Sequence, residues 1–179
     1  MIIYIVCLIV AGCILALDLV TKAVAVSQNF NVVIIPELLK FKLTYNKGAS
    51  FSFLADKSWA RYMFIAVTIV VCVAILCYFA YMLIKKKKTS KWLMISLAMI
   101  FSGALGNLID RIILGKVRDF IFVFYNTDIF PAIFNVADIS LVVSVIMLCV
   151  YLLFLDKDAV FKLKGKETKT DENTDGTSR

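Results

Sequence analysis

The hydrophobic and polar positions of this chain divide it into four long apolar runs separated by charged segments. The uncharged runs cover residues 1–17, 62–84, 92–109 and 139–155. About 20 apolar residues are needed for a helix to cross the hydrocarbon core of a bilayer. With the apolar residues that extend these runs, the pattern predicts transmembrane helices over about 2–26, 60–84, 91–112 and 135–155. The predicted fold class is an all-α polytopic membrane protein with four transmembrane helices.

Composition and charge agree with this class and indicate an orientation. The chain is 61% hydrophobic, whereas soluble domains are about 45–50% apolar. The net charge of +7 is concentrated beside the runs, above all at Lys85–Lys88 between the second and third, so it indicates no nucleic-acid partner. By the positive-inside rule this short segment is cytoplasmic. We therefore expect both termini in the cytoplasm and the loops 27–59 and 113–134 on the outer side.

The chain divides into one membrane domain and a tail. Residues 1–155 contain all four predicted spans. Residues 156–179 are rich in Lys, Glu, Thr and Asp, and basic and acidic side chains balance there. Such a composition is typical of disordered segments, so we expect a polar, disordered cytoplasmic tail.

The first outer loop has the alternation of a strand. Apolar and polar residues alternate over 39–45, which is the period of a half-buried strand. Asn46, Lys47 and Gly48 form a turn signal, and residues 49–53 alternate again. The pattern predicts a small extracytoplasmic β-hairpin with one apolar face on the membrane surface. The alternative is an ordinary surface hairpin, which periodicity alone does not exclude.

Polar side chains gather where the predicted spans approach the outer surface. They are Asp18, Lys22, Asn107, Asp110, Arg111, Asp119, Asn135 and Asp138. Because the predicted topology brings all of them to one layer, and because charges in spans normally line a water-filled site, the cluster indicates function.

Each of these residues also has a structural interpretation. Asp18 and Lys22 are spaced for an i, i+4 ion pair. Asp110 with the adjacent Arg111 could anchor the third helix at the interface. Asn135 could be the N-cap of the fourth helix, with Asp138 favoured by the helix dipole.

The residue types narrow the possible chemistry to carboxyl groups. The chain has no histidine, and its five cysteines lie in the apolar runs without metal-ligand spacing. We therefore expect no metal or cofactor. Asp119 and Asp138 have no opposite charge beside them except Arg118, which points elsewhere if residue 119 is extended. Two carboxyl groups brought together share a proton, so one can activate water while the other donates to a carbonyl oxygen, as in an aspartic protease.

Five motifs cover these polar clusters in order. They are DLVTK (18–22), YNKGASF (45–51), GALGNLIDR (103–111), VRDF (117–120) and FNVAD (134–138). With four spans, this set resembles the bacterial lipoprotein signal peptidase family, or signal peptidase II, over about residues 1–155. The loop departs mildly from the family pattern, with Ser50 where a second alanine is common.

The resemblance implies an intramembrane aspartic endopeptidase of the bacterial cell membrane. It implies cleavage of prolipoproteins just before the diacylglyceryl-modified cysteine, with Asp119 and Asp138 as the catalytic pair. The implied substrate-binding residues are Asn46, Gly48, Asn107, Arg111 and Asn135, and the implied structural supports are Asp18, Lys22 and Asp110. It further implies that the outer hairpin forms a cradle and the second outer loop a short helix or loop. The expected partners are modified prolipoproteins and membrane lipid, and the expected state is a monomer.

Two other function classes remain open. A small transporter or proton-conducting protein would use intramembrane acids as relays, but it predicts acids staggered through the membrane depth. A lipid-binding or assembly subunit would need no paired carboxyl groups.

Overall fold

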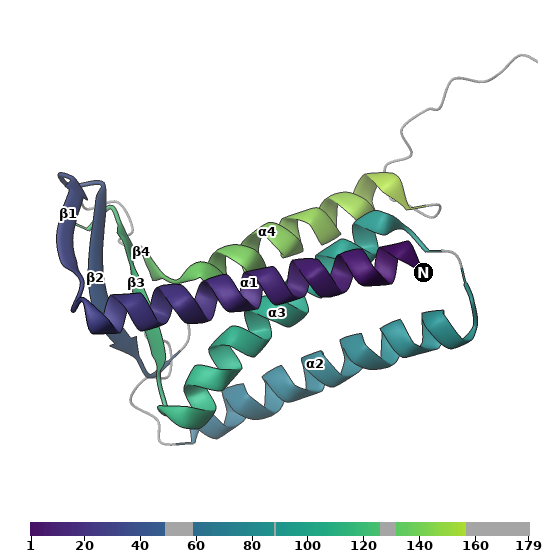
Figure 1. Cartoon of the computed structure of the whole chain (residues 1–179), viewed down its shortest axis with the longest axis horizontal. Coiled ribbons are helices and arrows are strands. Elements are labelled where there is room, and N and C mark those ends of the chain that lie inside the picture. The colour runs from purple at the N-terminus through teal and green to yellow at the C-terminus, as the bar shows by residue number, and fades with distance from the viewer. Residues whose placement is uncertain (49–58, 88, 126–131, 157–179) are drawn as a thin grey trace, which may run out of the picture.

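The computed structural model is a bundle of four helices with a four-stranded sheet at one end (Figure 1). It describes residues 1–48, 59–87, 89–125 and 132–156. The helices are α1 (Ile2–Ser27), α2 (Ala60–Ile84), α3 (Lys91–Ile113) and α4 (Val136–Val150), which continues as the π-helical turn η2 (Tyr151–Leu155). The strands are β1 (Asn31–Ile35), β2 (Leu39–Asn46), β3 (Val117–Val123) and β4 (Ala132–Phe134).

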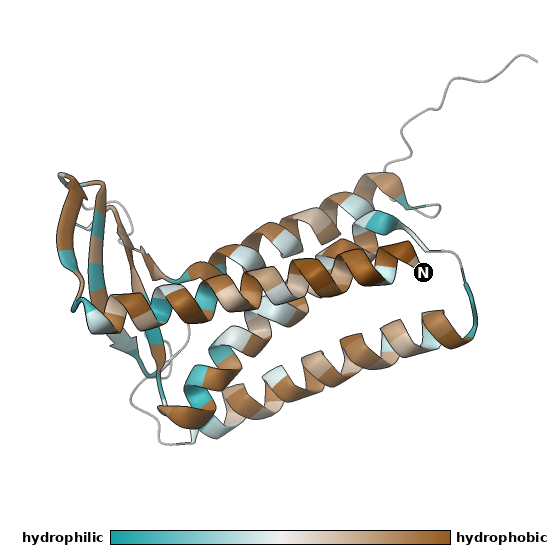
Figure 2. Ribbon diagram, in the orientation of Figure 1, coloured by the Kyte–Doolittle hydropathy of each residue, from teal (hydrophilic) through white to brown (hydrophobic). Residues whose placement is uncertain are grey.

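All four predicted helices are present, and each is long and apolar enough to cross a membrane. Most of their length is apolar, as Figure 2 shows by the brown colour along the bundle. Leu8 on α1 and Val70 on α2 are 76% and 67% exposed. Exposure of large apolar side chains on this scale is suited to contact with lipid rather than water.

Helix α3 lies at the centre of the bundle and packs against α1, α2 and α4. In the 18-residue apolar stretch of α3, 44% is buried inside the protein, compared with 11% of the corresponding stretches of α1 and α2. Its buried positions include Ser102, Gly103, Ala104 and Gly106, and small residues allow helices to approach closely in a membrane. Ser102 also donates a hydrogen bond of 2.7 Å to the carbonyl oxygen of Ala11 in α1.

Two glycines of α3 mark the closest approaches. A Cβ atom on Gly103 would lie 2.7 Å from the carbonyl oxygen of Ala137 in α4, and one on Gly106 would lie 2.5 Å from a carboxylate oxygen of Asp18 in α1. The bundle therefore has no room for a side chain at either position.

The sheet is antiparallel with the order β1-β2-β3-β4. In its register Thr44 lies opposite Asp119 and Tyr45 opposite Arg118. Strand β3 follows α3, and β4 leads directly into α4. The sheet thus places residues of the loop after α1 beside the ends of α3 and α4.

The turn from α3 into the sheet depends on a glycine and an arginine. Gly115 has a φ of 73°, in the left-handed region that favours glycine after a helix end. Arg61 at the start of α2 donates to the carbonyl oxygens of Arg111 and Ile112 in the last turn of α3, where helix carbonyl groups lack intrahelical partners.

The observed sheet corrects part of the expected loop structure. The strand over 39–45 is confirmed as β2, but its described partners are β1 and β3, and the expected returning strand over 49–53 lies outside the described residues. The second loop was expected to form a short helix or loop, whereas its described part contains β3 and β4. The reason is that residues 117–123 are rich in β-branched and aromatic side chains and have β2 as a pairing partner.

We expect Gly103→Ala to destabilise the protein, because the new methyl group meets a backbone oxygen that cannot move without shifting α4. Overpacking of this kind costs about 1–3 kcal/mol. The matched control is Gly12→Ala in α1, where the added Cβ would meet nothing within 4 Å. Thermal unfolding of the purified protein in detergent should show a lower midpoint for Gly103→Ala only. Equal midpoints would contradict the close packing of α3 on α4.

Candidate active site

The polar residues predicted to share a layer meet at the sheet end of the bundle. The described parts of α1, α3, β3 and the start of α4 contribute them. Several are almost fully buried, namely Asp18, Lys22, Asn107, Asp110, Asp119 and Asn135. Because buried polar groups must be paired to be tolerated, the pairing of each one determines what it can do.

The start of α4 is fixed by a capping box, which confirms Asn135 as the helix N-cap and places Asp138 in the first turn. The Asn135 side chain accepts a hydrogen bond of 3.0 Å from the backbone N–H of Asp138. In return the Asp138 carboxylate accepts one of 3.2 Å from the backbone N–H of Asn135. Asp18 in α1 accepts a third bond, of 2.9 Å, from the backbone N–H of Ala137. These acceptors satisfy donors that a helix N-terminus leaves unpaired.

Two of the four aspartates are neutralised by cations. The ammonium of Lys22, 0% exposed, lies 2.8 Å from Asp18 and 3.5 Å from Asp110. Arg118 lies 2.6 Å from Asp110 and also donates its backbone N–H to that carboxylate. The predicted Asp18–Lys22 pair is therefore confirmed.

The suggested pairing of Asp110 with Arg111 is wrong for the described residues. Adjacent residues on a helix point about 100° apart, so Asp110 faces the bundle while Arg111 turns toward the first loop. Arg111 donates to the carbonyl oxygen of Gly48 at 3.4 Å and lies over the ring of Phe64. The expectation that Arg118 points away from Asp119 is confirmed by its bonds to Asp110.

Asp119 and Asp138 are held by amides instead of cations. Asp119 accepts hydrogen bonds from the side chains of Asn135 at 2.6 Å and Asn46 at 3.1 Å. Asp138 accepts one of 2.7 Å from the side chain of Asn107. Among the described residues, no lysine or arginine lies within ion-pairing distance of either carboxylate.

Asn135 and Asn107 connect the two carboxylates to the ion cluster. The Asn135 amide bonds Asp119 while the Asn135 backbone bonds Asp138. The oxygen of Asn107 accepts from Lys22 at 3.0 Å and from Asn135 at 3.1 Å, so its nitrogen is the end that faces Asp138. Lys22 therefore fixes the orientation of the amide that holds Asp138.

Burial and the negative charge of Asp138 together raise the pKa of Asp119 to about 7. The bonds from Asn46 and Asn135 act in the opposite direction, because they favour the charged form, but they do not cancel the effect of burial. At neutral pH Asp119 is therefore near the midpoint of its titration, which is the range in which a carboxyl group can both give and take a proton.

The expected binding residues fall into two groups. Asn107 and Asn135 lie inside the network. Asn46, Gly48 and Arg111 lie at its edge toward the sheet, where Asn46 accepts from the backbone N–H of Gly48 at 2.9 Å. Arg111 also interacts electrostatically with both Asp119 and Asp138. In the part of the chain that the structure describes, no group of three or more cysteine or acidic side chains is arranged to hold a metal ion.

Sequence reasoning missed residues that position the site. Thr44 lies opposite Asp119 across the sheet, and Phe120 packs edge-on against Phe30, whose ring stacks on Phe41. Arg61 holds the end of α3. The β-branched run of β1 was a signal for a further strand, but no local signal indicates which strands pair.

Comparison of the sequence and the fold with known proteins places this chain in a family. Residues 10–154 match the family described as signal peptidase (SPase) II. A lipoprotein signal peptidase of Pseudomonas aeruginosa is 45% identical over 137 residues, which cover 74% of this chain and 78% of the relative. One from Ectopseudomonas mendocina is 39% identical over 150 residues, with 82% and 86% covered. A solved structure described as a bacterial membrane enzyme superposes with a TM-score of 0.71 at 30% identity, covering 89% of this chain and 93% of the other.

The fold is thus that of a bacterial membrane enzyme. The chain belongs to the signal peptidase II family, which is a family of peptidases.

We expect Lys22→Met to destabilise the protein strongly, because Asp18 and Asp110 would lose a buried cation. Removing one partner of a buried ion pair costs about 3–5 kcal/mol. Lys42→Met on the exposed face of β2 makes the same chemical change without this loss and should leave stability within about 0.5 kcal/mol. Thermal unfolding in detergent measures both. A Lys22→Met midpoint equal to that of Lys42→Met would show that the cluster does not need the ammonium.

Proposed function

We propose that this chain removes signal peptides from bacterial prolipoproteins, as an aspartic endopeptidase that uses Asp119 and Asp138. The proposed cleavage lies just before the diacylglyceryl-modified cysteine. Family membership and the names of the relatives support the substrate class. The mechanism is supported by the arrangement of the site.

One observation carries the mechanism: Asn135 bonds both carboxyl groups that lack a cation. Its short side chain and backbone keep Asp119 and Asp138 close together. Asp18 and Asp110, by contrast, are neutralised and have their oxygens occupied by Lys22, Arg118 and the backbone of α4. The site thus separates two acids that stabilise the bundle from two that remain able to exchange protons.

The pair can carry out hydrolysis without a covalent intermediate. The charged carboxylate takes a proton from a water molecule as its oxygen attacks the scissile carbonyl carbon. The protonated carboxyl donates to the carbonyl oxygen, which becomes a hydroxyl group of the tetrahedral intermediate. Collapse of that intermediate re-forms the carbonyl and breaks the C–N bond, and a proton passes to the leaving amine.

The reaction requires one proton on the pair, and the raised pKa of Asp119 provides it. A carboxyl group with a pKa of about 7 still holds a proton in a large fraction of molecules at neutral pH, whereas an ordinary aspartate does not. The protonation states belong to the coupled pair, so the pH profile describes both groups together.

The proposed orientation follows the positive charges. Lys85–Lys88 would face the cytoplasm with both termini, and the aspartate pair would lie near the outer leaflet of the bacterial cell membrane. The signal helix would lie among the spans while its diacylglyceryl chains stay in lipid. Asn46, Gly48 and Arg111 would contact substrate at the edge of the site, and Asn107 and Asn135 would support the pair. A monomer contains every residue of this arrangement.

A transporter is less well supported by the positions of the acids. The acidic residues within the four spans are Asp18, Asp110 and Asp138, and all three belong to the same connected network. A proton relay requires acids at successive depths along a path. The network forms one layer at the sheet end of the bundle instead.

We expect Asp119→Asn and Asp138→Asn, made separately, each to reduce prolipoprotein processing by at least about 10²-fold, because an amide can neither activate water nor donate an acidic proton. Glu37→Gln, the same carboxyl-to-amide change at an exposed position, should retain activity. Processing of a purified lipid-modified prolipoprotein in detergent measures all three. Full activity in either aspartate variant, with the protein folded, would refute the pair.

We expect activity to decline as the pH rises through about 7, since the pair then loses its last proton. Asn46→Ala should move this decline to higher pH, because the lost hydrogen bond favoured the charged form of Asp119 and its removal raises the pKa. The measurement is kcat/KM against pH, with Asn31→Ala on the exposed face of β1 as the control. A decline that stays in place or moves to lower pH in Asn46→Ala would contradict the role of Asn46.

A further inference from the structure

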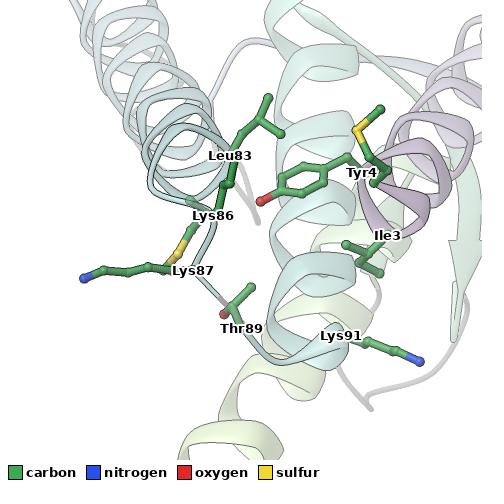
Figure 3. A pocket seen from close by; sticks show the side chains of 9 residues that line it. Ile3, Tyr4, Leu83, Lys86, Lys87, Thr89 and Lys91 are labelled. Atoms are coloured by element: carbon green, nitrogen blue, oxygen red, sulfur yellow. The ribbon is translucent and has the colours of Figure 1, made fainter.

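A cavity lies at the end of the bundle opposite the sheet, where the start of α1, the end of α2 and the start of α3 meet (Figure 3). Its volume is about 550 Å³, within the range of about 300–1,000 Å³ that is usual for small-ligand sites. None of the residues that line it belongs to the aspartate network. The proposed peptidase mechanism makes no use of this cavity.

The inner wall of the cavity is apolar, and α1 and α2 form it from opposite sides. Ile3 and Tyr4 line it from α1, and Met82 and Leu83 line it from α2. In Figure 3 the ring of Tyr4 extends from α1 toward the end of α2. Leu83 is 49% exposed, so this wall continues onto the outer surface of the bundle. An acyl chain can therefore run from the cavity along α2 without leaving apolar surroundings.

The mouth of the cavity carries three lysines. Lys86 and Lys87 follow the end of α2, and Lys91 begins α3. Lys86 has a φ of 49°, a left-handed conformation that usually selects glycine or asparagine after a helix. A lysine at this position accepts a local backbone strain and keeps a positive charge at the mouth. In Figure 3 the side chain of Lys91 points away from the cavity, which leaves the opening free.

Charge and polarity together select one class of ligand. A lysine-rich mouth favours an anion, and an apolar wall that continues into the lipid-facing surface favours acyl chains. Basic pockets between transmembrane helices bind the headgroups of anionic lipids. We propose that this cavity is a binding site for the headgroup of an anionic phospholipid, with its phosphate at Lys86 and Lys87 and its acyl chains against Leu83 and Met82.

This site is more specific than the general attraction of basic loops to membranes. Lysines beside a span are attracted to any anionic membrane surface nearby, and the positive-inside rule alone accounts for the presence of such charges. A built site also requires the cavity. A variant that fills the cavity while keeping every lysine therefore separates the two explanations.

The test uses the full chain, purified in detergent, and native mass spectrometry with phosphatidylglycerol and phosphatidylcholine of matched acyl chains. We expect the wild-type protein to retain phosphatidylglycerol in preference. The triple variant K86Q/K87Q/K91Q should lose this preference, by about fivefold for each lysine that contacts the phosphate. The control K40Q/K42Q/K116Q removes three positive charges at the sheet, two in β2 and one just before β3. This control should retain the preference for phosphatidylglycerol.

A cavity-filling variant, Leu83→Trp, keeps all three lysines and should also lose the preference. Because Leu83 is half exposed, we expect the larger side chain to leave folding intact, and the thermal midpoint in detergent verifies that. Equal retention of both lipids by the wild type, or an unchanged preference in Leu83→Trp, would overturn the proposal. Equal competition by glycerol phosphate, which has no acyl chains, would also overturn it in favour of a free phosphate ligand.

Discussion

The structure depends on the neutralisation of charge in a region that excludes water. Lys22 has no exposed surface, yet its ammonium contacts carboxylates of α1 and α3 and the amide oxygen of Asn107. An isolated ammonium in such surroundings is prohibitively costly, so these partners must arrive together when the helices pack. Since Asp18 also accepts from the backbone of α4, one lysine and its partners link three of the four helices.

The same network explains how neighbouring carboxyl groups acquire different properties. Cations hold Asp18 and Asp110, and amides hold Asp119 and Asp138. An amide satisfies a carboxylate without opposing its charge, so burial and mutual repulsion still act on Asp119. Choice of hydrogen-bond donor, rather than distance from the membrane centre, therefore separates the two acids paired with cations from the two that we propose as the reactive pair.

Much of this arrangement is readable from the sequence, and the limits have physical causes. Long uncharged runs define the four helices because the bilayer fixes their length, and a polar residue next to an apolar run identifies Asn135 as a cap. The pairing of Asp110 with Arg118 instead of Arg111 was not predictable, since it depends on how the chain turns at Gly115 into β3. The pairing of β2 with β1 and β3 was missed for a related reason: strand partners are selected by non-local contacts that a local alternation does not encode.

The capping box at the start of α4 has a consequence for changes in chain length. Asn135 is at once the helix cap and the bridge between Asp119 and Asp138, so the helix register and the geometry of the pair are set by the same residue. Inserting or deleting one residue between Asn135 and Ser140 would rotate the following residues by about 100° and separate the hydroxyl of Ser140 from the carbonyl oxygen of Met99 in α3, to which it donates. At the other end, α4 relaxes into the wider π-helical turn Tyr151–Leu155. Differences in span length between related chains should therefore accumulate at that end, far from the aspartates.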